Sequence, residues 1–332
     1  MKRYLIRNAN IYPVSKETDY LKMIYQSVFG VGHLIKDLDK AKNYLLSEME
    51  NLTYEKFESL YEYISDDFVR INLRPYKFLN LDVDELLNGM IDCANSNTGT
   101  YQDALCKIDI LRNLVKTKVI NIDINCIDEI LKQYPNELPL FHHSEEYRQA
   151  YSPHYRVVKA SFISDNLRWL NFRNFISSLS NGIVAIDGNC CTGKSFLTNK
   201  LDLTTIHIDD FFPENGKDRI QYDLALNAIN SISHSTDFSY RAFDCTRREY
   251  YEITQPKASD VVLVEGVYSM DPLLGKYYNY GVLFKCPYDV RINRLRQRCS
   301  DYIFDKFINI WIPNEDKYFL ENSLIENCYI II

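Results

Sequence analysis

No stretch of this chain stays apolar over the roughly 20 residues that a helix needs to cross a bilayer. Residues 1–10 mix polar and apolar side chains and lack the apolar core of a secretory signal. The nine cysteines contain no C-x-x-C pair, so they form neither a zinc pattern nor a disulfide framework. These absences predict a cytoplasmic protein with reduced thiols and no membrane partner.

An excess of positive charge is also missing. Lysine and arginine number 38 against 45 aspartates and glutamates, which gives a formal net charge of −7. Contacts along a nucleic-acid backbone need clustered basic side chains, so we expect no nucleic-acid partner. A small anionic ligand in a local basic pocket is still compatible with this balance. The 332 residues are enough for two domains with real cores.

The two halves of the chain differ in their apolar spacing, and no internal repeat or low-complexity tract is present. Residues 1–178 predict a mainly helical domain of unknown role, because apolar side chains recur there at helical intervals. The predicted helices cover residues 34–45, 55–71, 83–93, 101–115 and 126–133. A polar turn at 178–182 marks the predicted boundary, so the second domain covers 179–332.

Short apolar runs dominate the second half, and helix-compatible segments separate most of them. The runs lie at residues 183–186, 204–208, 261–264, 281–284 and 328–332. Strands that alternate with helices predict an α/β domain with a parallel sheet covered on both faces. In such sheets ligands bind outside the carboxyl ends of the strands, so the polar residues that follow each run are the candidates for a site.

The first of these strands leads into a glycine-rich loop. Its sequence is Gly188-Asn189-Cys190-Cys191-Thr192-Gly193-Lys194-Ser195, which fits the pattern G-x-x-x-x-G-K-[ST]. The glycines let successive backbone N–H groups point at phosphate oxygens, and the next helix adds its positive end. Lys194 is suited to the β- and γ-phosphates, and Ser195 to Mg²⁺. The loop therefore predicts ATP and Mg²⁺ as cofactors; a glycine turn without a ligand is the alternative.

Acidic side chains follow the next two predicted strands. Asp209 and Asp210 come after residues 204–208, and Glu265 comes after 261–264. Parallel topology brings these ends near the glycine-rich loop. Phosphoryl transfer needs a carboxylate that takes a proton from the attacking hydroxyl, and oxygen ligands for the metal. A helix cap or turn is the alternative for the aspartate pair.

Several of these segments resemble the uridine kinase and phosphoribulokinase-like family of P-loop kinases, over residues about 180–332. The markers are the loop with Ala185–Asp187 before it, His207–Phe212, Tyr240–Cys245 and Val264–Ser269. The resemblance implies a P-loop NTPase fold and transfer of the ATP γ-phosphate to a hydroxyl. It implies the following roles: Asp209 as catalytic base, Lys194, Arg294 and Arg298 on the phosphates, and Ser195, Glu265 and Asp209 at the metal.

The acceptor is the least defined part of this hypothesis. The position that holds ribose hydroxyls in nucleoside kinases of the family is Gln221 here, and we take Asp210, Gln221, Tyr222 and Arg241 as candidate acceptor residues. A nucleoside such as uridine is the leading acceptor by resemblance. A pantothenate-like or sugar-phosphate acceptor, or a nucleotide-dependent regulatory module without turnover, are the alternatives. Assembly into a homo-oligomer is left open.

A second group of polar signals has no assigned chemistry. His33, His142, His143 and His154 are interpreted as surface or packing histidines, because a metal site needs three or four ligands at workable geometry. The segment 144–156 is too specific in composition for a linker. The run Asn199–Asp202 matches the guanine-reading N-K-x-D pattern, but it falls inside the helix expected after the loop, so we interpret it as coincidence.

Overall fold

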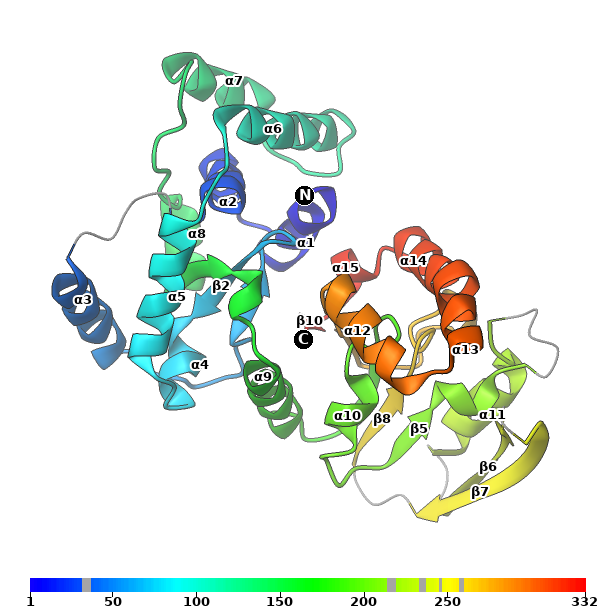
Figure 1. Cartoon of the computed structure of the whole chain (residues 1–332). Coiled ribbons are helices and arrows are strands. Elements are labelled where there is room, and N and C mark those ends of the chain that lie inside the picture. The colour runs from blue at the N-terminus through cyan, green and yellow to red at the C-terminus, as the bar shows by residue number, and fades with distance from the viewer. Residues whose placement is uncertain (32–36, 214–218, 233–236, 245–246, 257–259) are drawn as a thin grey trace. The chain divides into compact units, whose positions relative to one another are not determined.

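The computed structural model describes residues 1–31, 37–213, 219–232, 237–244, 247–256 and 260–332 (Figure 1). The chain divides into two compact units, Met1–Phe175 and Ile176–Ile332. His33 and the first residues of the helix predicted at 34–45 lie outside the described residues. In the part of the chain that is described, no helix combines the length and the apolar character that crossing a membrane requires.

The first unit is mainly helical, as the sequence predicts. Its helices are α1 (Lys2–Ile11), α2 (Glu17–Phe29), α3 (Leu38–Glu50), α4 (Leu73–Phe78), α5 (Val83–Asn95), α6 (Tyr101–Lys116), α7 (Ile124–Gln133), α8 (Glu145–Tyr151) and α9 (Asp165–Ser177), with the 3-10 turn η1 (Ala160–Phe162). The helices predicted at 83–93, 101–115 and 126–133 are confirmed as α5, α6 and α7. Side-chain caps fix several starts: Thr100 Oγ1, for example, accepts a hydrogen bond from the Asp103 N–H before α6.

A three-stranded antiparallel sheet lies within this helical unit. Its strands are β1 (Tyr61–Tyr63), β2 (Phe68–Asn72) and β3 (Tyr155–Lys159), in the order β1-β2-β3. The helix predicted over residues 55–71 is therefore wrong. Ser65 breaks the helical pattern, because its hydroxyl accepts hydrogen bonds from the backbone N–H groups of Asp67 and Phe68 and closes a turn. All five residues of β2 are buried, and they pair with a strand about 85 positions later in the sequence.

The core of the first unit packs against this sheet. Fully buried side chains from the strands meet those of the surrounding helices, and they include Tyr61, Val69, Ile71, Tyr76, Leu86 and Val158. Burial of such apolar surface stabilises the fold by roughly 25 cal/mol per Å². Strands β2 and β3 pair although they lie far apart in the sequence, so the residues of this sheet come together only in the folded chain.

The second unit is built on a five-stranded parallel sheet. Its strands are β4 (Gly182–Asp187), β5 (Thr205–His207), β8 (Val261–Glu265), β9 (Tyr280–Leu283) and β10 (Ile330–Ile331). They lie in the order β10-β9-β4-β8-β5, and all four neighbouring pairs are parallel. The predicted α/β class is confirmed. Every residue of β8 is buried, which agrees with its uninterrupted apolar sequence.

Helices and a hairpin complete the second unit (Figure 1). The helices are α10 (Lys194–Thr198), α11 (Tyr222–Ile232), α12 (Tyr288–Arg298), α13 (Asp301–Lys306), α14 (Ile312–Glu321) and α15 (Leu324–Asn327), with a π-helical turn η4 (Phe307–Trp311) before α14. Two 3-10 turns are η2 (Ile208–Phe211) and η3 (Pro272–Leu274). Strands β6 (Asp237–Asp244) and β7 (Glu249–Pro256) form a separate antiparallel hairpin.

The strand order of the parallel sheet reverses at β4. From β4 the chain passes to β5 and β8 on one side, and then to β9 and β10 on the other side. Strand β4 therefore lies at the point where the strand order reverses. Open α/β sheets bind ligands outside the carboxyl ends of their strands at such a switch point. In this chain the glycine-rich loop begins there, directly after Asp187.

Candidate active site at the glycine-rich loop

The loop between β4 and α10 is shaped by its two glycines. Gly188 has a φ of +146°, and a Cβ at this position would lie 2.4 Å from the carbonyl oxygen of Phe284. Gly193 has a φ of +93° and directly precedes Lys194. Side chains are disfavoured at both angles, and at Gly188 the space is also taken by the neighbouring backbone. The sequence therefore permits a tight loop whose backbone approaches its surroundings closely.

Lys194 lies under the loop and is almost fully buried. Its ammonium donates hydrogen bonds to the carbonyl oxygens of Gly188, at 2.7 Å, and of Asn189, at 3.0 Å. An ammonium has three N–H donors, so two of them hold the loop in place. The positive charge of Lys194 is thus fixed directly beside the loop backbone.

Ser195, Glu265 and His207 form a hydrogen-bonded row across the ends of β8 and β5. The Ser195 hydroxyl donates to Glu265 Oε1 at 3.1 Å, and Glu265 Oε2 lies 2.9 Å from His207 Nδ1. The bond to Glu265 raises the pKa of His207 above its usual value. Burial acts to raise the pKa of Glu265, but the contacts with His207 and Lys194 outweigh it and lower that pKa. Glu265 is thus ionised at neutral pH.

The hydroxyl of Ser195 and the carboxylate of Glu265 are oxygen groups of the kind that bind Mg²⁺. Mg²⁺ prefers oxygen ligands and is usually held by one or two carboxylates together with phosphates and water. Ser195 and Glu265 supply a hydroxyl and a carboxylate that already touch each other. In the described residues no three acidic, histidine or cysteine side chains converge as a complete metal cage. Ser195 and Glu265 are thus the oxygen groups beside the loop that match the ligand preference of Mg²⁺.

The two aspartates after β5 lie on the turn η2. Crowding by protein atoms raises the pKa of Asp209, and the nearby charge of Glu265 acts in the same direction. The Asp209 side chain is nevertheless exposed to solvent. Burial likewise raises the pKa of Asp210, whose Oδ2 accepts a 2.9 Å hydrogen bond from the Tyr240 hydroxyl. A carboxylate with a raised pKa is a better proton acceptor, as a general base requires.

Three arginines on one face of α12 contact the loop. Arg294 Nη1 donates to the Cys191 carbonyl oxygen at 3.4 Å, and Arg298 Nη1 lies 3.8 Å from Cys191 Sγ. The sequence prediction did not include Arg291, which is buried and donates from Nε to the Cys190 carbonyl oxygen at 3.1 Å. The spacing of three and four residues places all three on the same helical face, so this signal was present in the sequence.

Glu315 of α14 is a second residue that the sequence prediction missed. Its Oε2 accepts a 2.9 Å hydrogen bond from the Cys190 N–H and lies 3.6 Å from Arg291 Nη2. The Asn189 amide also reaches Glu315 Oε2, at 3.3 Å, and Asp316 Oδ1, at 2.9 Å. Burial raises the pKa of the Glu315 carboxyl. The Glu315 carboxylate therefore accepts a hydrogen bond from a loop N–H group of the kind that binds phosphate oxygens.

Asp187 is fully buried at the start of the loop. Its Oδ1 accepts from the Gly188 N–H at 2.7 Å, and its Oδ2 accepts from the Met270 N–H at 2.9 Å and the Tyr318 hydroxyl at 2.7 Å. Burial raises the pKa of Asp187 to about 6, although these three hydrogen bonds act to lower it. One carboxylate thus links the loop, the segment after β8 and helix α14.

The adjacent thiols of the loop differ in acidity. The hydrogen bond from Cys190 and the positive charge of Arg298 lower the pKa of the Cys191 thiol. The same contact and burial raise the pKa of the Cys190 thiol. Cys191 also has a positive φ of +59°, as befits a tight turn. Thr192, the remaining loop residue, donates its hydroxyl proton to the Asn189 carbonyl oxygen at 2.8 Å.

The candidate acceptor residues lie on α11, on the segment before it and on the hairpin. The Gln221 amide donates to the Phe212 carbonyl oxygen at 2.9 Å, and its Oε1 accepts from the Tyr250 hydroxyl at 2.9 Å. The Tyr222 hydroxyl donates to Asp271 Oδ2 at 3.0 Å. Arg241 is exposed and stacks over the Tyr250 ring at 4.1 Å. Gln221 and Tyr222 are therefore already engaged by protein groups.

No family model matches the chain, and no curated protein sequence is similar enough to count as a match. A structure described as a possible uridine kinase from Bacillus stearothermophilus is 16% identical, with 51% of this chain and all of that chain aligned and a TM-score of 0.41. A protein named provisionally as a fructose transport system kinase, from a Silicibacter species, is 17% identical over 46% of this chain and 90% of that chain, with a TM-score of 0.34.

Proposed function

We propose that residues 179–332 form an ATP-dependent phosphotransferase domain that acts on a hydroxyl group of a small molecule. The observation that carries the proposal is that Lys194, Ser195 and Glu265 lie together at the switch point of the sheet. This arrangement joins a fixed cation, a metal-binding hydroxyl and an ionised carboxylate around one glycine-rich loop. This combination is what phosphoryl transfer requires for positioning and charge stabilisation.

Each residue has a role in this reaction. The loop N–H groups and Lys194 bind the phosphates, and Ser195, Glu265 and Asp209 are the residues that would hold Mg²⁺, whose charge offsets that of the phosphate oxygens. Asp209 accepts the proton of the attacking hydroxyl. Arg294 and Arg298 lie beside the loop, where guanidinium groups stabilise charge on the transferring phosphoryl group.

The identity of the acceptor is inferred from the family resemblance and from the surroundings of Gln221 and Arg241. A nucleoside such as uridine is the first candidate, because of the family resemblance of the loop and the aspartate motif. The engagement of Gln221 with Phe212 and Tyr250 favours a second candidate, a different small hydroxyl compound, since a ribose would have to displace these bonds. Exposed Arg241 on the hairpin suits an acceptor that carries a negative charge.

The test compares two substitutions in assays of ATP binding and of ADP release with a panel of acceptors, uridine included. Asp209→Asn should lose turnover by orders of magnitude, because an amide cannot take the proton, and should keep most of the ATP affinity, because Ser195 and Glu265 remain for the metal. Lys194→Ala should weaken ATP binding. Asp202→Asn, an exposed carboxylate outside the site, is the matched control and should change neither quantity.

Two outcomes would count against the proposal. Unchanged ATP affinity in Lys194→Ala would show that the loop does not bind the nucleotide. ATP binding without turnover of any acceptor, and indifference to Asp209→Asn, would instead identify a nucleotide-dependent regulatory module.

A further inference from the structure

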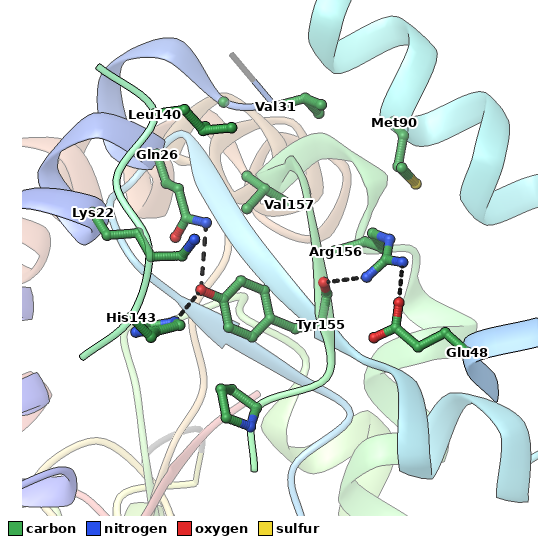
Figure 2. A pocket seen from close by; sticks show the side chains of 12 residues that line it. Lys22, Gln26, Val31, Glu48, Met90, Leu140, His143, Tyr155, Arg156 and Val157 are labelled. Carbon is green, nitrogen blue, oxygen red and sulfur yellow. Dashed lines mark hydrogen bonds and ion pairs between the residues drawn. The ribbon is translucent and has the colours of Figure 1, made fainter. Parts of the chain in front are cut away.

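A cavity of about 260 Å³ lies in the first unit, among residues that the proposed kinase function does not use. Figure 2 shows its polar lining, formed by Lys22 and Gln26 of α2, Glu48 of α3, His143 and the β3 residues Tyr155 and Arg156. That is room for a small organic molecule.

The Tyr155 hydroxyl at this cavity belongs to a hydrogen-bonded relay. His143 Nε2 lies 2.6 Å from the Tyr155 oxygen, and His143 Nδ1 lies 2.7 Å from Asp19 Oδ1. Asp19 also accepts hydrogen bonds from the Lys16 N–H and from both the N–H and the hydroxyl of Ser144. Asp19 can only accept, so the imidazole proton is on Nδ1 and Tyr155 donates to Nε2.

The relay is neutral apart from Asp19. Burial lowers the pKa of His143 to about 4, with Arg70 and Lys22 acting in the same direction against the bond to Asp19. Burial also raises the pKa of Tyr155. Although burial acts against it, the hydrogen bonds from His143 and Ser144 lower the pKa of Asp19. The cavity wall thus presents a polarised, uncharged tyrosine.

Two cations, Lys22 and Arg70, lie near this tyrosine, together with the carboxylates of Asp19 and Glu62. Arg156 forms an ion pair with Glu48, so these two side chains neutralise each other. Lys22 donates to the Phe141 carbonyl oxygen at 3.0 Å and, within the described residues, forms no ion pair with a carboxylate. Burial lowers the pKa of Lys22 to about 8, and Arg70 acts in the same direction while Asp19 opposes it.

Arg70 adds a second, deeper cation. It is 2% exposed, and its Nε and Nη2 both donate to Gln26 Oε1, at 3.1 and 2.8 Å. Its guanidinium also stacks over the Tyr155 ring at 4.6 Å. In the described part of the chain no carboxylate forms an ion pair with it. Burial acts to lower its pKa, but the surrounding tyrosines and Glu62 raise it. A buried cation without a direct ion pair is costly, and a nearby anion offsets that cost.

We propose that this cavity, which we call the Lys22 pocket, is a second ligand site and binds a small organic anion. The Lys22 ammonium and the Gln26 amide face the carboxylate or phosphate group of the ligand, beside the Tyr155 hydroxyl. Val31, Met90 and Val157 line the same cavity and give the uncharged part of the ligand an apolar surface. The site lies wholly within residues 1–175, so it is independent of the proposed kinase chemistry.

Methionine methyl NMR of the full chain tests this proposal. The protein has five methionines; Met90 lines the Lys22 pocket, and Met270 belongs to the second unit. The probes are butyrate, inorganic phosphate and, as an uncharged control, butyramide. Inorganic phosphate is titrated into the Lys194→Ala variant, so that the glycine-rich loop does not compete. Butyrate or phosphate should shift the Met90 methyl signal saturably and leave Met270 unchanged, while butyramide should not.

Substitutions connect the signal to the pocket. Lys22→Met should weaken the binding of butyrate at least tenfold, and Lys132→Met, at an exposed position on α7, should bind as the wild type does. Saturation by phosphate alone or by butyrate alone would support the site and identify the anionic group. Absence of a saturable Met90 shift with both anions, or wild-type affinity in Lys22→Met, would overturn the proposal.

A pH titration of the unsubstituted protein gives a second, independent readout. The affinity for butyrate should fall as the pH rises through about 8, because Lys22 then loses its charge. Arg70, from β2, and Asp19, from α2, are the charged groups that act on it, and neither changes charge in this range. Constant affinity between pH 7 and pH 9.5 would contradict the proposal even if Lys22→Met failed to fold.

Discussion

The backbone N–H of Cys190 donates a 2.9 Å hydrogen bond to the buried carboxylate of Glu315. This contact joins the glycine-rich loop to a helix that begins more than 100 residues later. In the proposed function the same N–H is a phosphate donor. A phosphate oxygen and the Glu315 carboxylate therefore compete for one hydrogen bond, and their negative charges repel.

Glu315→Gln should therefore strengthen ATP binding. We expect the dissociation constant to fall about threefold to tenfold, on the order of 1 kcal/mol, since the variant removes a competing charge. Burial raises the pKa of Glu315, so its neutral form gains as the pH falls. The advantage of the variant should accordingly shrink between pH 8 and pH 5.5. Calorimetric titration with ATP at several pH values measures both effects.

Asp316→Asn is the matched control for Glu315→Gln. Asp316 is the next residue and is exposed, and it contacts only the Asn189 side chain among the loop groups. It should leave the ATP affinity within about twofold of the wild type. Weaker ATP binding in Glu315→Gln would instead show that Glu315 holds the loop in its binding conformation.

Tyr318→Phe should destabilise the protein. The Tyr318 hydroxyl donates to the buried Asp187 carboxylate at 2.7 Å, and loss of a hydrogen bond to a charged group costs about 1.5–3 kcal/mol. Asp187 has a pKa raised to about 6 in the folded state, against an ordinary value of 3.8. The loss should be small near pH 4, where Asp187 is neutral, and full above pH 6. Urea unfolding at both pH values tests it, with exposed Tyr302→Phe as the control.

His207→Gln should show the opposite pH trend. The pKa of His207 is raised in the folded state, so its pairing with Glu265 stabilises the fold below pH 6.5 and ceases to do so as the pH passes the raised value. The side chain is 37% exposed, which limits the effect to less than about 1 kcal/mol. The variant should lose more stability at pH 6 than at pH 9, as measured by urea unfolding. An equal loss at both values would argue against a charged pair.

Cys191 should be the more reactive thiol of the loop. Its pKa is lowered by the contact with Cys190 and by Arg298, so a larger thiolate fraction is present at neutral pH. We expect iodoacetamide to modify Cys191 about tenfold faster than exposed Cys106 at pH 7, and bound ATP to slow the reaction. Peptide mass spectrometry reads the rates, and Cys191→Ser confirms the assignment. Preferential modification of Cys190 would contradict the expected order.

The sheet of the second unit could be predicted because its strands carry local signals. Val261–Val264 is apolar without interruption, since β8 is buried on both faces between β4 and β5. The loop could be predicted for a similar reason: Gly188 and Gly193 are required by backbone angles that the pattern records. Local constraints of this kind produce a recognisable pattern in a short stretch of sequence.

Contacts between distant segments produce no such local pattern in the sequence. Glu315 and Tyr318 meet the loop only because α14 packs beside it, and nothing near residue 315 indicates this. The segment 55–71 shows that a local pattern can also predict the wrong element. Its apolar residues fit a helical repeat, but pairing of β2 with β3 and the turn at Ser65 decide the structure. Likewise, His143 and Tyr155 become neighbours only across a loop, a helix and a strand.

The β6–β7 hairpin has a consequence for how this protein can change over evolution. The hairpin follows α11 and precedes β8 in the sequence, and in the described residues its two strands pair only with each other. The register of the parallel sheet therefore does not depend on hydrogen bonds from the hairpin, although Tyr240, Ala242 and Phe243 are buried. Because Tyr240 reaches Asp210, a substitution at this tyrosine alters the surroundings of the aspartates and leaves Lys194 and Ser195 in place. The fold thus assigns the surroundings of the aspartates and the glycine-rich loop to separate elements, which can change independently.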